Sequence, residues 1–192
     1  MRRLVAQAAA LDRFITERGW SGCIIDGMAN LRWGEPRLTR DVDATIITGF
    51  GGEAPYIEAL LQEFRPRIAD AARFALENRV LLLLTEDGIP LDIALGGLPF
   101  EEQMVARATS AELAPGVFVR TVSAEDLVVL KAFADRDRDW VDIAGIAARQ
   151  GPALDWDAVV ARLGPLVELK EAPEILAKLT AVREKHAHRP LT

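Results

Sequence analysis

The chain has 192 residues, of which 50% are hydrophobic and 27% are charged, and this balance indicates a globular protein with a packed core. A chain of this length forms one domain, or one domain with a small appendage. Its formal net charge of -6 argues against a protein whose main task is to wrap duplex DNA, because binding many phosphates requires a basic surface.

The single cysteine is compatible with a reducing cytoplasm, and the N-terminal segment does not resemble a signal peptide. Cys23 has no second cysteine for a disulfide, and we expect it to be a small buried residue entering a strand. Two arginines precede a small apolar stretch, as in a signal peptide, but Gln7 interrupts it and helical spacing follows. No segment approaches the roughly 20 apolar residues that span a bilayer. We therefore expect a soluble, cytoplasmic protein with no membrane partner.

The N-terminal part of the chain predicts a helix and two strands. Apolar residues at helical spacing predict a helix over residues 3–18, which Gly19 ends. The run Cys23–Ile25 predicts a strand, and we expect a helix to begin at Asn30–Trp33. Alternation over residues 41–46 predicts a strand with one face toward a core and the other toward a cleft.

The middle of the chain predicts two helices and a hairpin. Helices are expected over Tyr56–Phe64 and Ile68–Leu76. The apolar runs Val80–Thr85 and Ile89–Leu95 flank a turn that contains Gly88, so they predict a β-hairpin. Both strands of the hairpin should belong to the same sheet.

After the hairpin the pattern changes from mixed to helical. We expect a helix over Phe100–Ala108, a strand over Gly116–Val122, and a helix that Ser123 caps. From Trp140 onward no strand is expected, and the last helix should start at Ala172.

These elements predict an α+β fold with a mixed sheet flanked by helices. We divide it into an α/β core over residues 1–122 and a helical C-terminal segment over residues 123–192 that packs on the core. His186 and His188 would lie on different sides of a helix, so we expect no metal site there.

An Asp-x-Asp pair, Asp41 and Asp43, predicts a metal site. Alternate residues of a strand share one face, and two carboxylates side by side in a cleft favour a cation between them. Oxygen ligands of this kind select Mg²⁺, and two such ions can assist an in-line phosphoryl displacement. Asp92, which lies between Leu91 and Ile93, is the candidate third ligand because a lone acid in an apolar strand requires a reason. The alternative is an Asp-x-Asp surface turn.

The segment after the first predicted strand is a candidate phosphate site. Gly27 and Met28, next to the expected helix start, would let backbone N–H groups approach a triphosphate. The alternative is that Gly27 is a turn glycine.

Basic residues supply the cations that a phosphate site requires. Lys131 is the only lysine before Lys170, so it is either a compact charge for phosphate or a surface lysine. Asp139 and Asp142 share a helix face, and they would orient Lys131 or Arg40 or only solvate the helix.

The arginines around the acidic pair have two interpretations. Arg32, Arg37 and Arg40 would neutralise phosphates or contact an acceptor nucleic acid. Alternatively, they balance nearby acidic residues.

The segment from Ile25 to Asp43 resembles the core signature of the polymerase-β-type nucleotidyltransferase superfamily, and more narrowly the minimal nucleotidyltransferases related to the AbiEii toxin family. That family has a hydrophobic strand, Gly-Gly or Gly-Ser, Asp-x-Asp on the next strand and a third Asp on a later one. Lys131 and the segment 136–143 resemble a second family motif, Lys followed by Arg-x-Lys-Asp-x-x-Asp. The resemblance covers about residues 20–150.

The resemblance implies a nucleotidyltransferase fold and a Mg²⁺-dependent enzyme with one or two ions. It would move a nucleoside monophosphate from a nucleoside triphosphate to an acceptor hydroxyl on RNA or protein. The implied metal ligands are Asp41, Asp43 and Asp92, which with Lys131 form the catalytic set. The residues implied to hold the nucleotide are Gly27, Met28, Arg40, Lys131 and Asp139. Family analogy also implies a toxin–antitoxin component with a cognate antitoxin-like partner.

Two departures from the family pattern leave an alternative open. Asp26 stands where the family has its first glycine, and an acidic side chain there repels a triphosphate unless it turns away or binds metal. Arg138 stands where relatives often have Lys. The alternative function is a catalytically silent member that binds a nucleotide or a partner protein.

Overall fold

The computed structural model describes residues 1–186, which form two compact units. The first consists of Met1–Met28 and Leu38–Val122. The second consists of Ala29–Arg37 and the described residues from Ser123 onward. The division into domains 1–122 and 123–192 stays a prediction, because the second unit also takes residues from the N-terminal part of the chain.

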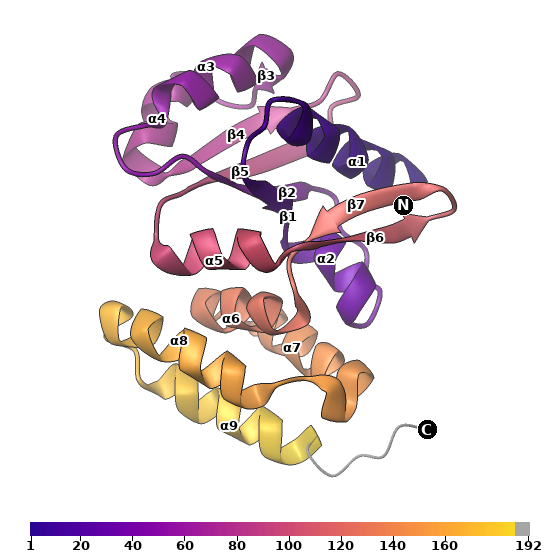
Figure 1. Cartoon of the computed structure of the whole chain (residues 1–192), viewed down its shortest axis with the longest axis vertical. Coiled ribbons are helices and arrows are strands. Elements are labelled where there is room, and N and C mark those ends of the chain that lie inside the picture. Colours follow the sequence, from indigo (N-terminus) through magenta and orange to yellow (C-terminus); the bar gives the residue numbers. More distant parts are fainter. Residues whose placement is uncertain (187–192) are drawn as a thin grey trace. The chain divides into compact units, whose positions relative to one another are not determined.

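A mixed sheet forms the centre of the first unit (Figure 1). Within the described residues its strands are β1 (Gly22–Ile24), β2 (Val42–Ile47), β3 (Arg65–Pro66), β4 (Val80–Leu84), β5 (Pro90–Gly96), β6 (Thr109–Ala114) and β7 (Val117–Thr121). Their order across the sheet is β3-β4-β5-β2-β1-β7-β6. β2 runs parallel to β5 and antiparallel to β1, and β1 runs parallel to β7. The sheet is therefore mixed, as the sequence predicted.

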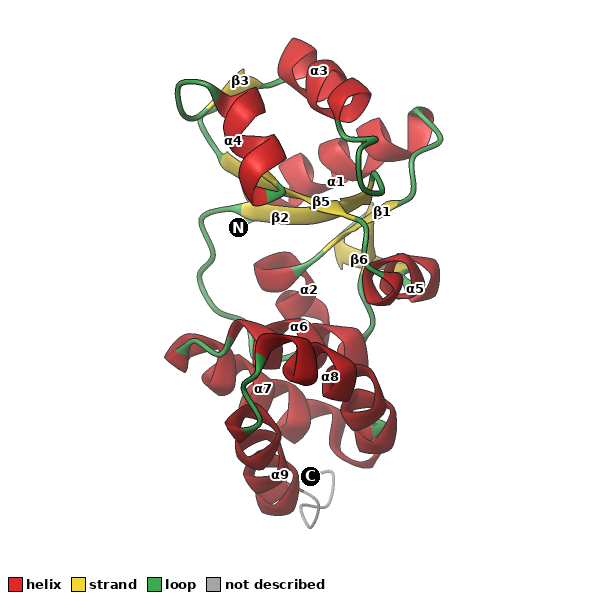
Figure 2. Cartoon of the chain, turned by 90° about the vertical axis from the view of Figure 1, so that its left-hand side faces the viewer, coloured by secondary structure: helices red, strands yellow, loops and turns green. Residues whose placement is uncertain are grey.

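Helices cover both faces of this sheet. The helices of the first unit are α1 (Arg2–Glu17), α3 (Ala54–Glu63), α4 (Ala71–Asn78) and α5 (Pro99–Arg107). α1, α3 and α4 lie on one face and α5 lies on the other (Figure 2). α1 turns its apolar stripe, which includes Leu4, Leu11 and Ile15, into the core, and this is the periodicity that predicted it.

The predicted hairpin is confirmed, because β4 and β5 pair antiparallel with a turn that contains Gly88 at φ +77°. Strands β3 and β6 were not predicted. β3 has two exposed residues, and β6 has no fully buried residue and is held by antiparallel pairing with β7. Both are edge strands that are held by backbone hydrogen bonds. Their sequences show no apolar alternation from which a strand could be predicted.

The prediction that a helix begins at Asn30 was wrong by four residues. Helix α2 (Asp26–Trp33) begins almost directly after β1. Asp26 has φ +42°, a conformation that Asp and Asn tolerate better than other non-glycine residues. Its side chain also lies in the first helical turn, where a carboxylate is stabilised.

The described residues of the second unit form helices and connecting loops, with no strand among them. The unit contains α6 (Ala124–Ala134), α7 (Asp137–Gln150), the 3₁₀ turn Gly151–Ala153, α8 (Trp156–Lys170) and α9 (Glu174–His186). Ser123 Oγ accepts the Asp126 N–H at 3.1 Å, which confirms the predicted cap. His188 lies outside the described residues. None of the helices within residues 1–186 has the length and apolar character needed to cross a membrane.

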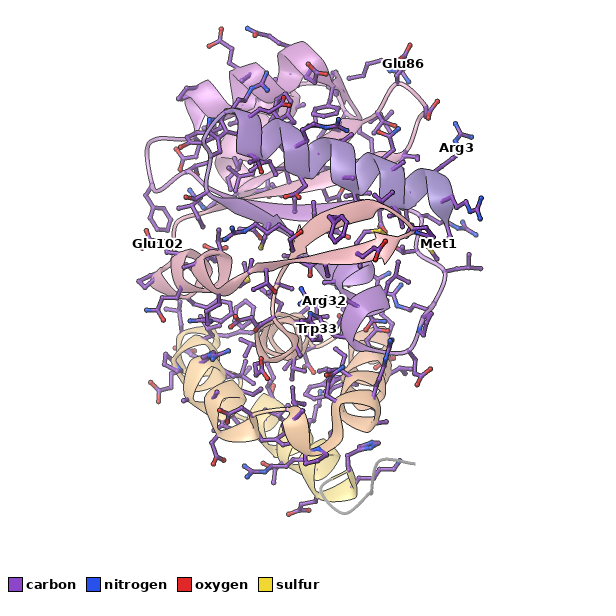
Figure 3. All side chains as sticks on the ribbon, turned by 45° about the vertical axis from the view of Figure 1, so that its right-hand side comes forward. Met1, Arg3, Arg32, Trp33, Glu86 and Glu102 are labelled. Carbon is purple, nitrogen blue, oxygen red and sulfur yellow. The ribbon has the colours of Figure 1, made fainter. Side chains whose placement is uncertain are left out.

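Side chains at the end of α7 explain why residues 29–37 join the second unit. Arg149 Nη1 donates to the Gly34 carbonyl at 2.6 Å, and Gln150 Nε2 donates to the Trp33 carbonyl at 2.7 Å. The guanidinium of Arg32 lies 4.0 Å from the centre of the Trp33 ring (Figure 3). The Arg149 and Gln150 side chains thus satisfy carbonyls at the end of α2, where a helix leaves its last carbonyls without partners of its own.

An ion pair between Glu53 and Arg79 fixes the loop after β2. Arg79 Nη1 lies 2.5 Å from Glu53 Oε1, while Nη2 donates to the carbonyl of Gly49 at 2.9 Å and to that of Leu95. The Arg79 hydrogen bond holds the pKa of the Glu53 carboxyl below its ordinary value of 4.5. The pair therefore connects this loop to the end of β5.

We expect Glu53→Gln to lower the free energy of unfolding at pH 7. The free energy of unfolding of the variant should also depend less on pH in the acidic range. A carboxyl with a lowered folded-state pKa stabilises the protein above its unfolded pKa, and that stabilisation is lost as the pH falls through the folded pKa. The stability gap between wild type and variant should thus narrow below pH 4.5. Urea denaturation at several pH values measures it. A gap that is constant with pH would contradict the assignment.

Candidate active site

Two of the predicted acidic residues lie side by side in the sheet. Asp43 on β2 and Asp92 on β5 are direct partners in the parallel register. Paired residues of neighbouring strands are about 4.8 Å apart and point to the same face. Asp41 immediately precedes β2, and all three side chains are half-buried. The pairing of β2 with β5 thus brings together Asp43 and Asp92, which lie far apart in the sequence.

Arg67 is a neighbour of Asp92 that the sequence did not reveal. Arg67 Nη1 lies 2.8 Å from Asp92 Oδ1, and each side chain is 30% exposed. Asp92 Oδ1 is buried and accepts no hydrogen bond, so this contact is a charge interaction without hydrogen-bond geometry. The backbone N–H of Arg67 donates to the Leu82 carbonyl at 3.0 Å. From the sequence, the position of Arg67 near Asp92 could be predicted only by predicting that β3 pairs with β4.

Asp41 is connected to Gly27 through Thr39. Thr39 Oγ1 donates to Asp41 Oδ1 at 2.7 Å. A Cβ at Gly27 would lie 2.5 Å from the same Thr39 oxygen and 2.9 Å from Thr39 Cβ. Glycine is therefore required at position 27 by close packing against the residue that orients Asp41.

We expect Gly27→Ala to destabilise the protein by about 1–3 kcal/mol, because the added methyl group displaces Thr39. Alanine otherwise favours a helix over glycine, so any loss comes from this contact. Gly164→Ala is the control: a Cβ there meets nothing within 4 Å, and we expect a change under about 1 kcal/mol. Urea denaturation of both variants measures the difference. Equal stability of the two variants would exclude the contact.

The start of α2 offers backbone donors. The first N–H groups of a helix have no acceptors within the helix, and they favour anions. Met28 is fully buried and Gly27 is buried as well, so their N–H groups lie beneath the surface of the first unit. Gly27 adds no side chain that would keep a ligand away. Asp26, in the same turn, is half-buried and brings its own negative charge.

In the second unit Lys131 is buried between two carboxylates. It is 2% exposed, and its Nζ lies 2.7 Å from Asp142 Oδ2 and 3.4 Å from Asp139 Oδ1. The alternative of a surface lysine was therefore wrong. One carboxylate oxygen of each acid lies within 4.8 Å of the other, and the ammonium group offsets their repulsion. The apolar residues on both sides of Lys131 in α6 explain why a lysine there must be paired.

Two arginines complete this charge network. Arg37 Nε donates to both carboxylate oxygens of Asp142, at 2.8 and 3.0 Å, and Arg136 Nε lies 2.5 Å from Asp139 Oδ2. Burial raises the pKa of Asp142, but the hydrogen bonds from Arg37 and Lys131 outweigh it and hold the pKa below its ordinary value of 3.8. The structure thus pairs Arg37 with an acidic residue, whereas Arg40 is exposed.

The fold and this arrangement of acids define the class of protein. A mixed sheet with an Asp-x-Asp strand beside a parallel strand that carries a third Asp is the expected nucleotidyltransferase fold. The structure is similar to an antigenic nucleotidyltransferase-like protein from Paracoccidioides brasiliensis, with a TM-score of 0.52 and 16% identity, covering 93% of this chain and 92% of that chain. At this identity the similarity shows the fold alone.

The family follows from the sequence. The chain belongs to the family described as nucleotidyl transferase AbiEii toxin, type IV toxin–antitoxin system, whose sequence profile matches residues 27–165. The protein is therefore a nucleotidyltransferase, as the resemblance implied.

Two further solved structures have lower TM-scores. The lincosamide antibiotic adenylyltransferase LnuA has a TM-score of 0.47 and 12% identity, covering 70% of this chain and 90% of that chain. The antibiotic-resistance factor ANT(2'')-Ia has a TM-score of 0.46 and 16% identity, covering 95% of this chain and 91% of that chain. No curated protein matches the chain.

Proposed function

We propose that the protein is a Mg²⁺-dependent enzyme that transfers a nucleoside monophosphate from a nucleoside triphosphate to a hydroxyl group of RNA or protein. The observation that supports this most is the pairing of Asp43 with Asp92 on neighbouring parallel strands, with Asp41 at the entry to β2. Paired acids at one place in a sheet are unfavourable unless they serve a cation.

The acidic residues suit a divalent metal ion. Asp92 Oδ1 is buried without a hydrogen bond, and carboxylate oxygens are the ligands that Mg²⁺ prefers. Asp41, Asp43 and Asp92 would hold one or two ions. When bound, such ions supply charge neutralisation at the transferred phosphate and at the leaving pyrophosphate.

The remaining groups bind and orient the reactants. Backbone N–H groups of Gly27 and Met28 would donate to triphosphate oxygens, and exposed Arg40 would attract the nucleotide or the acceptor. Asp92 would accept the proton of the acceptor hydroxyl while the hydroxyl oxygen forms a bond to the α-phosphorus. The bond from the α-phosphorus to pyrophosphate breaks, and most of the acceleration comes from positioning.

Lys131 and Asp139 keep a predicted role. The resemblance assigns them to the nucleotide, and within the second unit the Lys131 ammonium group lies 3.4 Å from Asp139 and 2.7 Å from Asp142. The Lys131 side chain is 2% exposed, so contact with a phosphate requires the ammonium group to become accessible at this site. The contact of Lys131 with a nucleotide stays a prediction.

The test is incubation of the protein with each α-³²P-labelled nucleoside triphosphate, Mg²⁺ and either total RNA or cell protein. We expect label on one acceptor, loss of label transfer with EDTA, and release of pyrophosphate. Calorimetry that shows Mg-nucleotide binding, together with no transfer to either acceptor, would favour the silent alternative. That alternative is motivated by Asp26 beside the proposed phosphate donors.

A toxin role, with an antitoxin-like partner, is the biological setting that we propose on the basis of the family. Expression of the wild type should slow growth, and Asp41→Ala should relieve the effect at equal protein level. Growth inhibition that is the same with Asp41→Ala would contradict a toxic activity at this site.

A further inference from the structure

We propose that Arg67 is a positioning residue that links metal binding to nucleotide binding. In the metal-free protein its guanidinium neutralises Asp92, and in the nucleotide complex it leaves Asp92 and binds a phosphate of the triphosphate. The inference rests on the proposed function, because it takes Asp92 to be a metal ligand.

The charges around Asp92 explain why a cation lies there. Asp43 is its direct neighbour in the parallel register, so two like charges lie side by side on one face. Arg67 Nη1, 2.8 Å from Asp92 Oδ1, offsets that repulsion. Arg67 is therefore the resident counter-ion of Asp92 before any metal arrives.

The same charge opposes a metal ion. A divalent cation at Asp92 Oδ1 is repelled by a guanidinium in contact with that oxygen, so Arg67 must weaken the binding of metal alone. Asp92 Oδ1 accepts no hydrogen bond from Arg67, so the guanidinium is held there by charge alone and no well-formed hydrogen bond breaks when it leaves.

The attachment of Arg67 lets its head group move while its backbone stays. The Arg67 N–H donates to the Leu82 carbonyl at 3.0 Å, next to the short pairing of β3 with β4. The side chain is 30% exposed, so rotation about its own bonds is enough to turn the guanidinium away. A guanidinium fork matches the geometry of phosphate oxygens. A metal–nucleotide complex would thus satisfy both Asp92 and Arg67.

The experiment is a Mn²⁺ titration followed by electron paramagnetic resonance, with and without a non-hydrolysable ATP analogue. We compare wild type with Arg67→Gln, Arg67→Lys, Asp92→Asn and the control Arg65→Gln, which removes the same charge from an exposed residue of β3. Without nucleotide, Arg67→Gln should bind Mn²⁺ about 3–10-fold more tightly than wild type. With Mn²⁺ present it should bind the analogue about 5–50-fold more weakly. Arg65→Gln should change neither affinity by more than about twofold.

The outcomes separate this inference from the proposed function. If Asp92→Asn binds Mn²⁺ as wild type does, Asp92 is not a metal ligand and the proposed metal site is wrong. If Asp92→Asn loses Mn²⁺ but Arg67→Gln matches Arg65→Gln, the metal site stands and the role of Arg67 is overturned. Arg67→Lys, which keeps the charge but not the fork, covers the case in which Arg67→Gln fails to fold. It should bind Mn²⁺ like wild type and the analogue more weakly, and unchanged affinity for the analogue would also overturn the role.

Discussion

Replacing Asp43 by Asn should reduce nucleotidyl transfer by about 10²–10³-fold or more while the fold stays intact. Asn has nearly the same shape as Asp, but it removes the negative charge beside Asp92 in the parallel register. The proposed Mg²⁺ site would lose one of its charged ligands. Initial rates of label transfer from α-³²P-labelled nucleotides to the acceptor measure the loss.

A matched variant isolates the effect of position. Asp87→Asn makes the same change at the tip of the hairpin between β4 and β5, where the side chain is 45% exposed. We expect its transfer rate to stay within about twofold of wild type and both melting temperatures to change little. Full activity of Asp43→Asn would remove the foundation of the proposed site.

Replacing Lys131 by Met should destabilise the protein by about 3–5 kcal/mol, because it removes the cation between two buried acids. Lys131 is 2% exposed, and the side chains of Asp139 and Asp142 are 0% and 4% exposed, so water cannot replace the lost charge. Arg37 and Arg136 still contact these acids, which places the loss toward the lower end of the range. Urea denaturation at pH 7 measures it.

The control is Lys185→Met near the end of α9, an exposed lysine that should change stability by no more than about 0.5 kcal/mol. A similar small change in Lys131→Met would mean that the buried charge network contributes little. Transfer rates should be compared only where Lys131→Met is folded, so that a loss of activity is not a loss of structure.

The sequence predicted the parts of the fold that local patterns control. The helical spacing of α1, the alternation in β2 and the turn at Gly88 each follow from residues close together in the chain. It also singled out Asp43, as part of the Asp-x-Asp pair, and Asp92, because a lone acid within an apolar strand is unusual. What it did not contain was their register, which depends on pairing β2 with β5 across α3, β3, α4 and β4.

The contacts that sequence reasoning missed also join distant parts of the chain. Arg67 lies near Asp92 only because β3, β4 and β5 are neighbours in the sheet. Lys131 was identified from its rarity, but its burial and its two partners follow from the packing of α6 with α7. The early start of α2 was missed because an Asp with positive φ resembles a turn in a linear pattern.

The passage of α2 from one unit into the other limits how this protein can be dissected. The chain crosses between the units after Met28, after Arg37 and after Val122. Cleavage between Val122 and Ser123 would leave residues 29–37 on the N-terminal fragment, while Arg149 and Gln150, whose side chains hold the end of α2, would go to the other. Neither fragment would contain a complete helical unit. Recombination or domain exchange at a single junction therefore cannot separate the two units, and they must be exchanged together.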